Sequence, residues 1–284
     1  MVRPARRGGP VTIVSQTSEK IESLRAEGRA AFVAYLPVGF PDVAGSVDAV
    51  RTVIEAGADV VELGIPYSDP VMDGTVIQHA TQAALAGGVR LRDAFAVVEQ
   101  VAGAGVPIVL MSYFNPILAY GVDAFSRDLA AAGGAGIITP DLIPDEASEW
   151  VTASDAHGLD RIFLVAPSST RERLALTAKA SRGFVYASST MGVTGERATL
   201  SAEAEALVAR TREAGAERVC VGVGVSTPEQ ATEVGRYADG VIVGTALVRQ
   251  LVEAPDRAAG LKKLSTVARA LAEGVRGARR EETA

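Results

Sequence analysis

The sequence predicts one α/β domain, a (β/α)8 TIM barrel with an extra N-terminal helix. Short β-rich runs alternate with amphipathic stretches about eight times along the 284 residues, which is typical of strands joined by helical crossovers. The strand-like runs are almost continuously apolar, as parallel strands covered on both faces are. An open doubly wound sheet would carry a glycine fingerprint after its first strand, and the run from Leu36 to Pro41 is not one. A closed barrel is therefore the favoured architecture.

The individual elements follow from this alternation, taken in chain order. The expected strands begin at Phe32, Asp59, Pro107, Gly136, Arg161, Phe184, Arg218 and Gly240. The expected helices between them include Val43–Ala56, Leu91–Ala104, Val122–Ala132, Asp145–Ala156, Thr170–Ala180, Ala202–Ala214 and Pro228–Tyr237. A short helix from Thr245 is expected after the last strand.

The ends of the chain add no second domain, so residues 1–284 are expected to form one unit. Residues 1–14 are expected to be a loose arm, and Ser15 to Gly28 a helix across the bottom of the barrel. The charged tail, residues 277–284, is expected to be frayed.

Composition excludes several classes of function. With 28 Lys plus Arg against 34 Asp plus Glu, the net charge of -6 argues against nucleic acid or an anionic membrane as partner. No apolar stretch approaches the roughly 20 residues that span a bilayer. The single cysteine, Cys220, lies in an apolar run and cannot form an intrachain disulfide. We therefore expect a soluble, cytoplasmic protein.

Carboxylates dominate the ends of the expected strands, where barrel enzymes carry their active sites. The polar residues found there are Glu62, Asp69, Asp73, Tyr113, Asn115, Asp141, Tyr186 and Thr194. His79 and His157 have no second ligand nearby, so no metal site is expected. The four lysines all fall on helical stretches, which disfavours Schiff-base chemistry. Proton transfer by carboxylates remains.

Glu62 is the most informative residue of the chain. It lies inside the apolar run Asp59–Gly64, where an ionised carboxylate is costly unless it is paired or solvated. One interpretation is a strand-end carboxylate satisfied by backbone N–H groups. The other is an acid/base catalyst.

Glycine turns follow the last three expected strands, at Gly192–Gly195, Gly222–Ser226 and Gly244–Thr245. Backbone N–H groups at such turns can hold a phosphate without lysine or arginine. Their place matches the usual phosphate site of barrels, where a short extra helix directs its N-terminus at the anion.

Together these residues resemble the tryptophan synthase alpha subunit family. The matching segments are Glu62–Gly74, Met111–Pro116, Pro140–Glu146, Gly192–Gly195 and Val241–Ala246. The resemblance extends from about Phe32 to Leu251, and its first segment is highly specific. It implies retro-aldol cleavage of indole-3-glycerol phosphate to indole and glyceraldehyde 3-phosphate, which makes the chain a carbon–carbon lyase of tryptophan biosynthesis.

The resemblance also implies roles for individual residues. Glu62 would be the general acid/base, and Asp73 would stabilise positive charge on the indole nitrogen. Tyr186 would line the site near Glu62, and Tyr35 and Tyr113 would help form the indole pocket; ordinary core packing is the alternative for each tyrosine.

The phosphate would bind at four positions that match the family, namely Gly195, Gly224, Gly244 and Thr245. Thr194 would belong to a closing loop that contacts the loop of Asp73.

The family implies a complex with a beta subunit that carries pyridoxal phosphate (PLP), as an alpha2beta2 tetramer, with no cofactor in this chain. Pro66, Asp69 and Asn115 would face this partner.

Two positions depart from the pattern of some family members. Thr190 lies in the segment before Gly192 where some have an arginine, and Phe184 replaces a second tyrosine. We expect these departures to bear on loop closure and on hydrogen bonds around Glu62.

Three alternatives remain open at this stage. The chain could be a stand-alone lyase that releases free indole, a non-catalytic subunit that stimulates its partner, or a barrel that acts on another phosphorylated sugar derivative.

Overall fold

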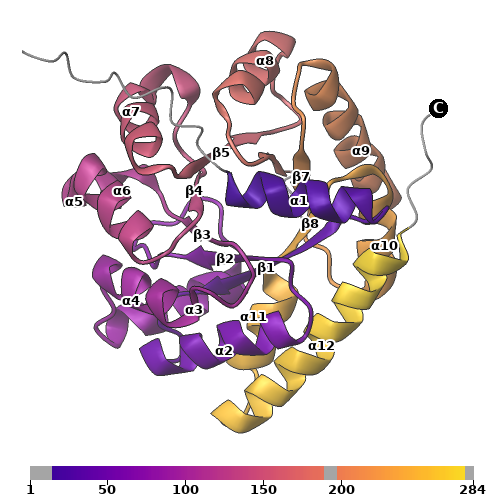
Figure 1. Cartoon of the computed structure of the whole chain (residues 1–284). Helices are drawn as coiled ribbons and strands as arrows, with labels where there is room; N and C mark the ends of the chain where they lie inside the picture. The colour runs from indigo at the N-terminus through magenta and orange to yellow at the C-terminus, as the bar shows by residue number, and fades with distance from the viewer. Residues whose placement is uncertain (1–14, 189–196, 279–284) are drawn as a thin grey trace, which may run out of the picture.

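A computed structural model describes residues 15–188 and 197–278 of the chain. Eight parallel strands close a barrel in which each strand pairs with the next along the chain and β8 pairs with β1 (Figure 1). The strands are β1 (Ala31–Pro37), β2 (Val60–Gly64), β3 (Ile108–Met111), β4 (Gly136–Thr139), β5 (Asp160–Val165), β6 (Val185–Ser188), β7 (Val219–Gly222) and β8 (Gly240–Val243). The predicted (β/α)8 barrel is confirmed.

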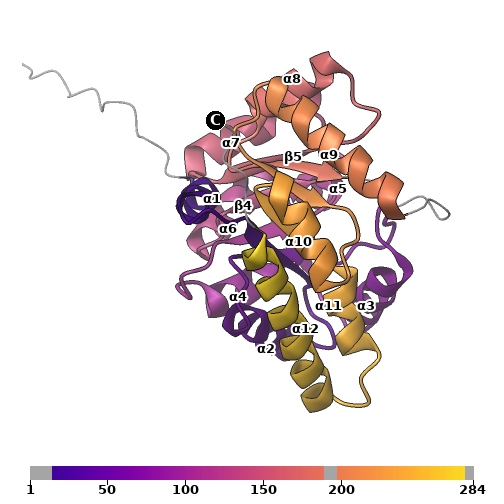
Figure 2. The same ribbon diagram turned by 90° about the vertical axis from the view of Figure 1, so that its right-hand side faces the viewer.

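Helices surround the barrel on all sides, and one closes its end. In the described residues they are α1 (Gln16–Ala26), α2 (Val43–Glu55), α3 (Thr75–Ala86), α4 (Leu91–Val101), α5 (Phe114–Tyr120), α6 (Val122–Ala131), α7 (Ser148–His157), α8 (Arg171–Ala180), α9 (Arg197–Glu213), α10 (Pro228–Tyr237), α11 (Thr245–Val252) and α12 (Arg257–Gly277), with a 3-10 turn η1 (Pro144–Glu146) before α7. Figure 2 shows α12 beside α10 and α11 on the outside. No helix in the described ranges meets the length and hydropathy of a bilayer-crossing segment.

The interior of the barrel is filled by apolar side chains rather than by a channel. Strands contribute one inward layer that consists of Val33, Val60, Val109, Ile138, Ile162, Cys220 and Ile242, and Phe184 joins it from just before β6. Ile21 and Leu24 of α1 pack against this cluster from below, so the N-terminal helix closes the bottom of the barrel, as predicted (Figure 1). The active end must lie above this layer.

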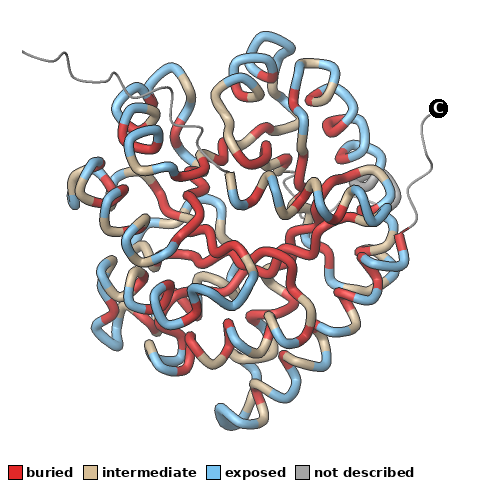
Figure 3. The backbone as a smooth tube through the Cα atoms, in the orientation of Figure 1, coloured by how far each residue is buried: buried red, intermediate tan, exposed pale blue. Residues whose placement is uncertain are grey.

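A second and larger core lies between the strands and the outer helices. It includes Trp150 of α7, Phe125 of α6 and Phe163 of β5, all of which are fully buried. Figure 3 shows the consequence: buried backbone forms the strands and inner helix faces, and exposed backbone forms the periphery. This two-core packing holds the strand ends in place.

Helix boundaries differ from the predicted ones by a few residues, for local reasons. Helix α4 stops at Val101 rather than at Ala104, because Gly103 and Gly105 both adopt positive φ angles. Helix α7 starts at Ser148 rather than at Asp145, because Pro144–Glu146 forms a 3-10 turn first.

Three buried aspartates fasten the bottom of the barrel. Asp239 accepts 2.8 Å hydrogen bonds from Arg25 of α1, from Arg212 of α9 and from the backbone N–H of Val219.

Asp160 also binds α1 to the barrel. Asp59 binds the segment between α1 and β1. Asp160 accepts from the hydroxyl and the N–H of Thr17 at 2.7 and 3.2 Å. Asp59 accepts two bonds from Arg29 and one from the N–H of Phe32. Both oxygens of Asp59 and of Asp239 therefore accept hydrogen bonds, whereas Oδ1 of Asp160 accepts none among the described residues and lies 3.8 Å from Nε of Arg182.

Candidate functional site

A cavity of about 380 Å³ opens at the C-terminal end of the barrel. Seven of the eight strands or the turns just after them contribute to its wall. The lining residues are Tyr35, Glu62, Val71, Met72, Asp73, Gly74, Ile77, Met111, Leu164, Tyr186, Ser188, Gly222, Gly224, Ile242, Gly244 and Thr245. The wall is thus mainly apolar, with carboxylates and tyrosines on one part and glycine turns on another, which suits a ligand with an aromatic end and an anionic end.

Glu62 reaches the cavity from the middle of β2. Its side chain is 1 % exposed, and its Oε2 has no hydrogen-bond partner among the described residues. Burial raises the pKa of this carboxyl to about 8, and the nearby charge of Asp73 contributes. The backbone-satisfied interpretation therefore does not describe Oε2, and a carboxyl with this pKa can both give and take a proton near neutral pH.

Asp73 lies in the loop between β2 and α3 and faces the same cavity. Burial raises the pKa of Asp73 above its ordinary value. In the described part of the chain, neither Asp73 nor Glu62 forms an ion pair with lysine or arginine. Two carboxyl groups with different burial share one cavity, an arrangement that separates acid and charge-stabilising roles.

Two buried tyrosines of the wall are each packed against a glycine of the following strand. A Cβ added at Gly64 would lie 2.2 Å from the Tyr35 hydroxyl, and one added at Gly222 would lie 2.4 Å from the Tyr186 hydroxyl. Burial, with the charges of Glu62 and Asp73, raises the pKa of both tyrosines well above the ordinary value. Both therefore remain neutral donors.

Tyr113 was predicted to help form the indole pocket, but its side chain does not line the cavity. Its hydroxyl accepts hydrogen bonds from the backbone N–H groups of Val71 and Met72 at 2.9 and 3.0 Å. Its ring lies 5.0 Å from that of Tyr67, centroid to centroid. Tyr113 therefore holds the loop that carries Asp73.

The glycine turns after β7 and β8 lie together on one side of the cavity. Gly224 has a φ angle of 72°, a conformation that favours glycine. Gly244 is the N-cap of α11, and Thr245 is its first residue. The free N–H groups at the start of such a helix can bind an anion. Thr194 and Gly195, like Thr190, lie outside the described residues.

Ser188 was missed by the sequence analysis. It is the last residue of β6 and lines the cavity. Its position at the end of a strand could have identified it as a site residue. Phe184, in contrast, lies in the apolar layer below the cavity and does not line it.

The residues predicted to face a partner lie on the surface around the mouth. Asp69 and Asn115 are exposed, and Pro66 is half-buried. Large apolar side chains are exposed in the same two segments: Val71, in the loop after β2, is 81 % exposed, and Leu118, on α5, is 51 % exposed. An exposed apolar group of this kind is typical of an interaction surface.

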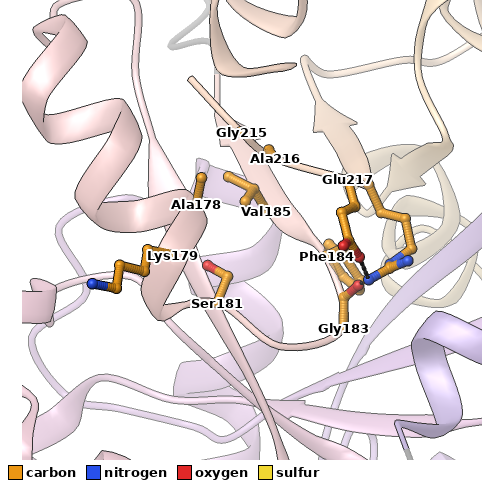
Figure 4. Close-up of a pocket in the computed structure, with 10 residues that line it drawn as sticks. Ala178, Lys179, Ser181, Gly183, Phe184, Val185, Gly215, Ala216 and Glu217 are labelled. Atoms are coloured by element: carbon orange, nitrogen blue, oxygen red, sulfur yellow. Dashed lines mark hydrogen bonds and ion pairs between the residues drawn. The ribbon is translucent and has the colours of Figure 1, made fainter. Parts of the chain in front are cut away.

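A second hollow, of about 300 Å³, lies at the opposite end of the barrel, around the start of β6 and the turn before β7 (Figure 4). Its cation Arg218 is occupied by Glu22, by Glu217 and by the carbonyl of Gly183. Figure 4 shows Lys179 directed away from that group. The charge of Arg218 is therefore already paired, and Lys179 is exposed.

Metal ligation finds no support in the part of the chain that the structure describes, where no group of three or more His, Cys, Asp or Glu is suited to it. His79 is exposed on α3. His157 lies 2.9 Å from Asp123, in a surface pair between α7 and α6.

Comparison with known proteins gives one consistent answer. The family model described as tryptophan synthase alpha chain matches residues 21–276. The tryptophan synthase alpha chain of Mycobacterium marinum is 59% identical over 274 residues, 96% of each chain. That of Thermobifida fusca is 56% identical over 264 residues, which cover 92% of this chain and 98% of the relative.

Solved structures agree with this result. The structure of Mycobacterium tuberculosis tryptophan synthase in space group F222 matches with a TM-score of 0.86 and 56% identity, over 93% of this chain and 99% of that chain. The tryptophan synthase subunit alpha of Legionella pneumophila matches with a TM-score of 0.82 and 32% identity, over 92% of this chain and 98% of that one.

Proposed function

The chain belongs to the tryptophan synthase alpha chain family, a lyase family of tryptophan biosynthesis, and we propose that Glu62 is its general acid/base. The reaction is cleavage of indole-3-glycerol phosphate to indole and glyceraldehyde 3-phosphate. The observation that carries the assignment is the buried Glu62 carboxyl, which faces the cavity with a pKa of about 8. At neutral pH such a group is protonated and ready to act as an acid.

Cleavage requires two proton transfers, and one carboxyl can perform both. Protonated Glu62 gives its proton to indole C3, which leaves a positive charge on the ring nitrogen. The resulting carboxylate then takes the proton of the side-chain hydroxyl next to the breaking bond. The O–H electrons form the aldehyde C=O, the C–C bond breaks, and its electrons restore the indole ring. Glu62 ends protonated, as it began.

Asp73 stabilises the positive charge that the ring nitrogen carries between the two transfers. It is less buried than Glu62 and therefore ionises more readily. An ionised carboxylate in a cavity wall that is largely apolar stabilises a nearby cation strongly, because little solvent screens it.

The rest of the wall orients the substrate. Tyr35 and Tyr186 flank the indole ring, and the turns at Gly224 and Gly244 with Thr245 hold the phosphate through backbone N–H groups. Gly195 and Thr194 complete the phosphate site and the closing loop in this proposal. Acid/base chemistry by side chains requires no cofactor in this chain.

The partner is a tryptophan synthase beta subunit, which carries PLP and receives the indole, in an alpha2beta2 tetramer. Pro66, Asp69 and Asn115 would contact it. The exposed apolar side chains Val71, in the loop after β2, and Leu118, on α5, lie in the same segments as these residues. A partner that covered them would remove an otherwise unfavourable surface.

Indole release from indole-3-glycerol phosphate tests the proposal. The purified chain is assayed alone and with a beta subunit, and Glu62→Gln is assayed beside it. We expect slow release that rises with the partner and disappears in the variant. Release that is undiminished in Glu62→Gln would exclude Glu62 as the catalyst. Release that the partner does not change would favour the stand-alone lyase, and no release by the wild-type chain would favour a stimulatory subunit.

A further inference from the structure

The ring of Tyr35 lies in a slot between two glycines of neighbouring strands. On the β2 side, a Cβ at Gly64 would lie 2.2 Å from the Tyr35 hydroxyl oxygen, 2.7 Å from Cζ and 2.8 Å from Cε2. On the β8 side, a Cβ at Gly244 would lie 3.1 Å from Cδ1. Strand β1 pairs with both β2 and β8. A Cβ at Gly64 would displace the ring, and one at Gly244 would crowd it.

The slot places the Tyr35 hydroxyl above Glu62. Tyr35 is in register with Glu62, and Gly64 follows Glu62 by two residues. Side chains alternate along a strand, so position 64 faces the same side as Glu62, one step nearer the cavity mouth. Because the hydroxyl lies against Gly64, the ring extends past the Glu62 level toward the mouth.

Within the described residues, the Tyr35 hydroxyl has no hydrogen-bond partner. Neither Glu62 nor any other described residue is hydrogen-bonded to it. Tyr35 lines the cavity, and its hydroxyl oxygen is not among the fully enclosed atoms, so a hydrogen-bond partner can reach it from the cavity. A bound ligand in the cavity can supply that partner.

The position of Tyr35 indicates which part of a ligand it meets. The Cδ1 side of the ring lies beside Gly244, at the proposed phosphate turn, and the hydroxyl end lies over Glu62. The part of the substrate that spans the distance between phosphate and indole is the hydroxylated three-carbon chain. Its hydroxyl oxygens are acceptors for a neutral phenol.

We propose that Gly64 is a positioning residue that, together with Gly244, fixes the Tyr35 hydroxyl as a hydrogen-bond donor to the glycerol chain of the substrate. The proposal rests on the proposed function for the identity of that chain. It gives the Tyr35 hydroxyl a role in selecting for the side chain, while the ring of Tyr35 flanks the indole.

The first test removes the hydroxyl alone. In Tyr35→Phe we expect the KM for indole-3-glycerol phosphate to rise about 10-fold, since one hydrogen bond to the substrate is lost, with kcat changed less than KM. The affinity for free indole, measured by equilibrium dialysis, should be unchanged, because indole lacks the glycerol chain. An unchanged KM, or an equal loss of indole affinity, would overturn the proposal.

The second test moves the hydroxyl. In Gly64→Ala the new methyl group displaces the ring, and we expect kcat/KM to fall about 10-fold or more. Tyr35→Leu removes the clashing Cε2, Cζ and hydroxyl atoms. The double variant Gly64→Ala with Tyr35→Leu should therefore be no worse than Tyr35→Leu alone, whereas independent effects would multiply.

Two controls keep this test decisive. Gly277→Ala adds a methyl group where nothing lies within 4 Å, and its kinetics should match the wild type. Calorimetric binding of glycerol 3-phosphate provides a second readout that needs no turnover. If the wild-type chain cleaves nothing, the proposed function fails, and the affinity of Tyr35→Phe for this probe still decides the role of the hydroxyl. Multiplying losses in the double variant would overturn the role of Gly64.

Discussion

Two buried carboxylates at opposite ends of the barrel, Asp239 and Glu62, have opposite surroundings. At the bottom, Asp239 is fully buried and accepts hydrogen bonds from two arginines and a backbone N–H. At the top, Glu62 is 1 % exposed, and its Oε2 has no such partner among the described residues. The same chemical group therefore stabilises one end, and at the other end it is left with a raised pKa and available for chemistry.

This difference indicates how the fold separates stability from function. The bottom donors come from α1, α9 and the strand backbone, so the ion pairs also fasten α1 under the barrel. The top carboxylates face a cavity, where any cation that satisfied them would abolish their use. Replacing a carboxylate should thus lower activity at the top and lower stability at the bottom.

Among the variants that test the difference between the two ends, Asp73→Asn should show the largest effect, a loss of activity. We expect kcat for indole release to fall by about 100-fold or more, because a neutral amide cannot balance the positive charge on the indole nitrogen. The thermal unfolding midpoint should stay equal or rise, since an unpaired, partly buried charge is removed. Glu273→Gln, an exposed carboxylate on α12, is the control for kinetics. Full activity in Asp73→Asn would contradict the assigned role.

Asp239→Asn tests the bottom end. It leaves Arg25 and Arg212 facing a neutral group, and breaking a buried pair in this way costs about 3 kcal/mol. We expect urea unfolding to show a loss of that size, while kcat at 25 °C stays within about twofold of the wild type because the cavity is at the far end. A large loss of kcat without a loss of stability would show that the two ends are coupled.

The sequence predicted the top of the molecule better than the bottom. Glu62 could be identified as a candidate because a charge within an apolar strand is unusual, and the neighbouring residues in the sequence are enough to show it. Asp160 is the first residue of β5, and Asp239 directly precedes β8, yet the role of each depends on partners far away in the sequence. Asp160 bonds to Thr17, 143 residues distant, and no periodicity predicts such a pair.

The limits of prediction inside the site are also steric. The barrel, its alternation of strands and helices, and the N-terminal helix can be predicted from local sequence patterns of a few residues. The clearance that Gly64 gives to Tyr35 depends on how a ring from another strand is placed. The place of Tyr113, outside the cavity lining, depends on a loop conformation. Contacts between side chains of different strands therefore could not be predicted from the sequence and became visible in the structure.

The pH dependence of stability gives a smaller and graded test of the difference. The pKa of Glu62 rises from 4.5 to about 8 on folding. Between these values the unfolded chain has released the proton and the folded chain retains it, so the contribution of Glu62 is complete below about pH 4.5 and is lost as pH rises toward 8. The wild type should therefore lose stability relative to Glu62→Gln across this window. Urea unfolding of both proteins at successive pH values measures it, and parallel curves would contradict the raised pKa.

Tyr113→Phe should give the smallest effect. The loop with Asp73 is held by the Tyr113 hydroxyl, which accepts from the N–H groups of Val71 and Met72. Loss of these hydrogen bonds should lower the free energy that favours the ordered loop by about 1 kcal/mol. It should lower kcat/KM a few-fold, mainly by raising KM. Global stability should change little, because a surface loop contributes less to it than the core does.

Hydrogen exchange gives this last prediction a direct readout. The amides of Val71 and Met72 should exchange faster in Tyr113→Phe, while those of the β strands do not change. Tyr120→Phe is the matched control, because it removes a phenol hydroxyl that donates to Asp128 on the surface and does not touch the loop. Equal exchange in both variants would mean that the loop is held by other contacts. Faster exchange confined to Tyr113→Phe would mean that the top end depends on a few hydrogen bonds where the bottom depends on buried ion pairs.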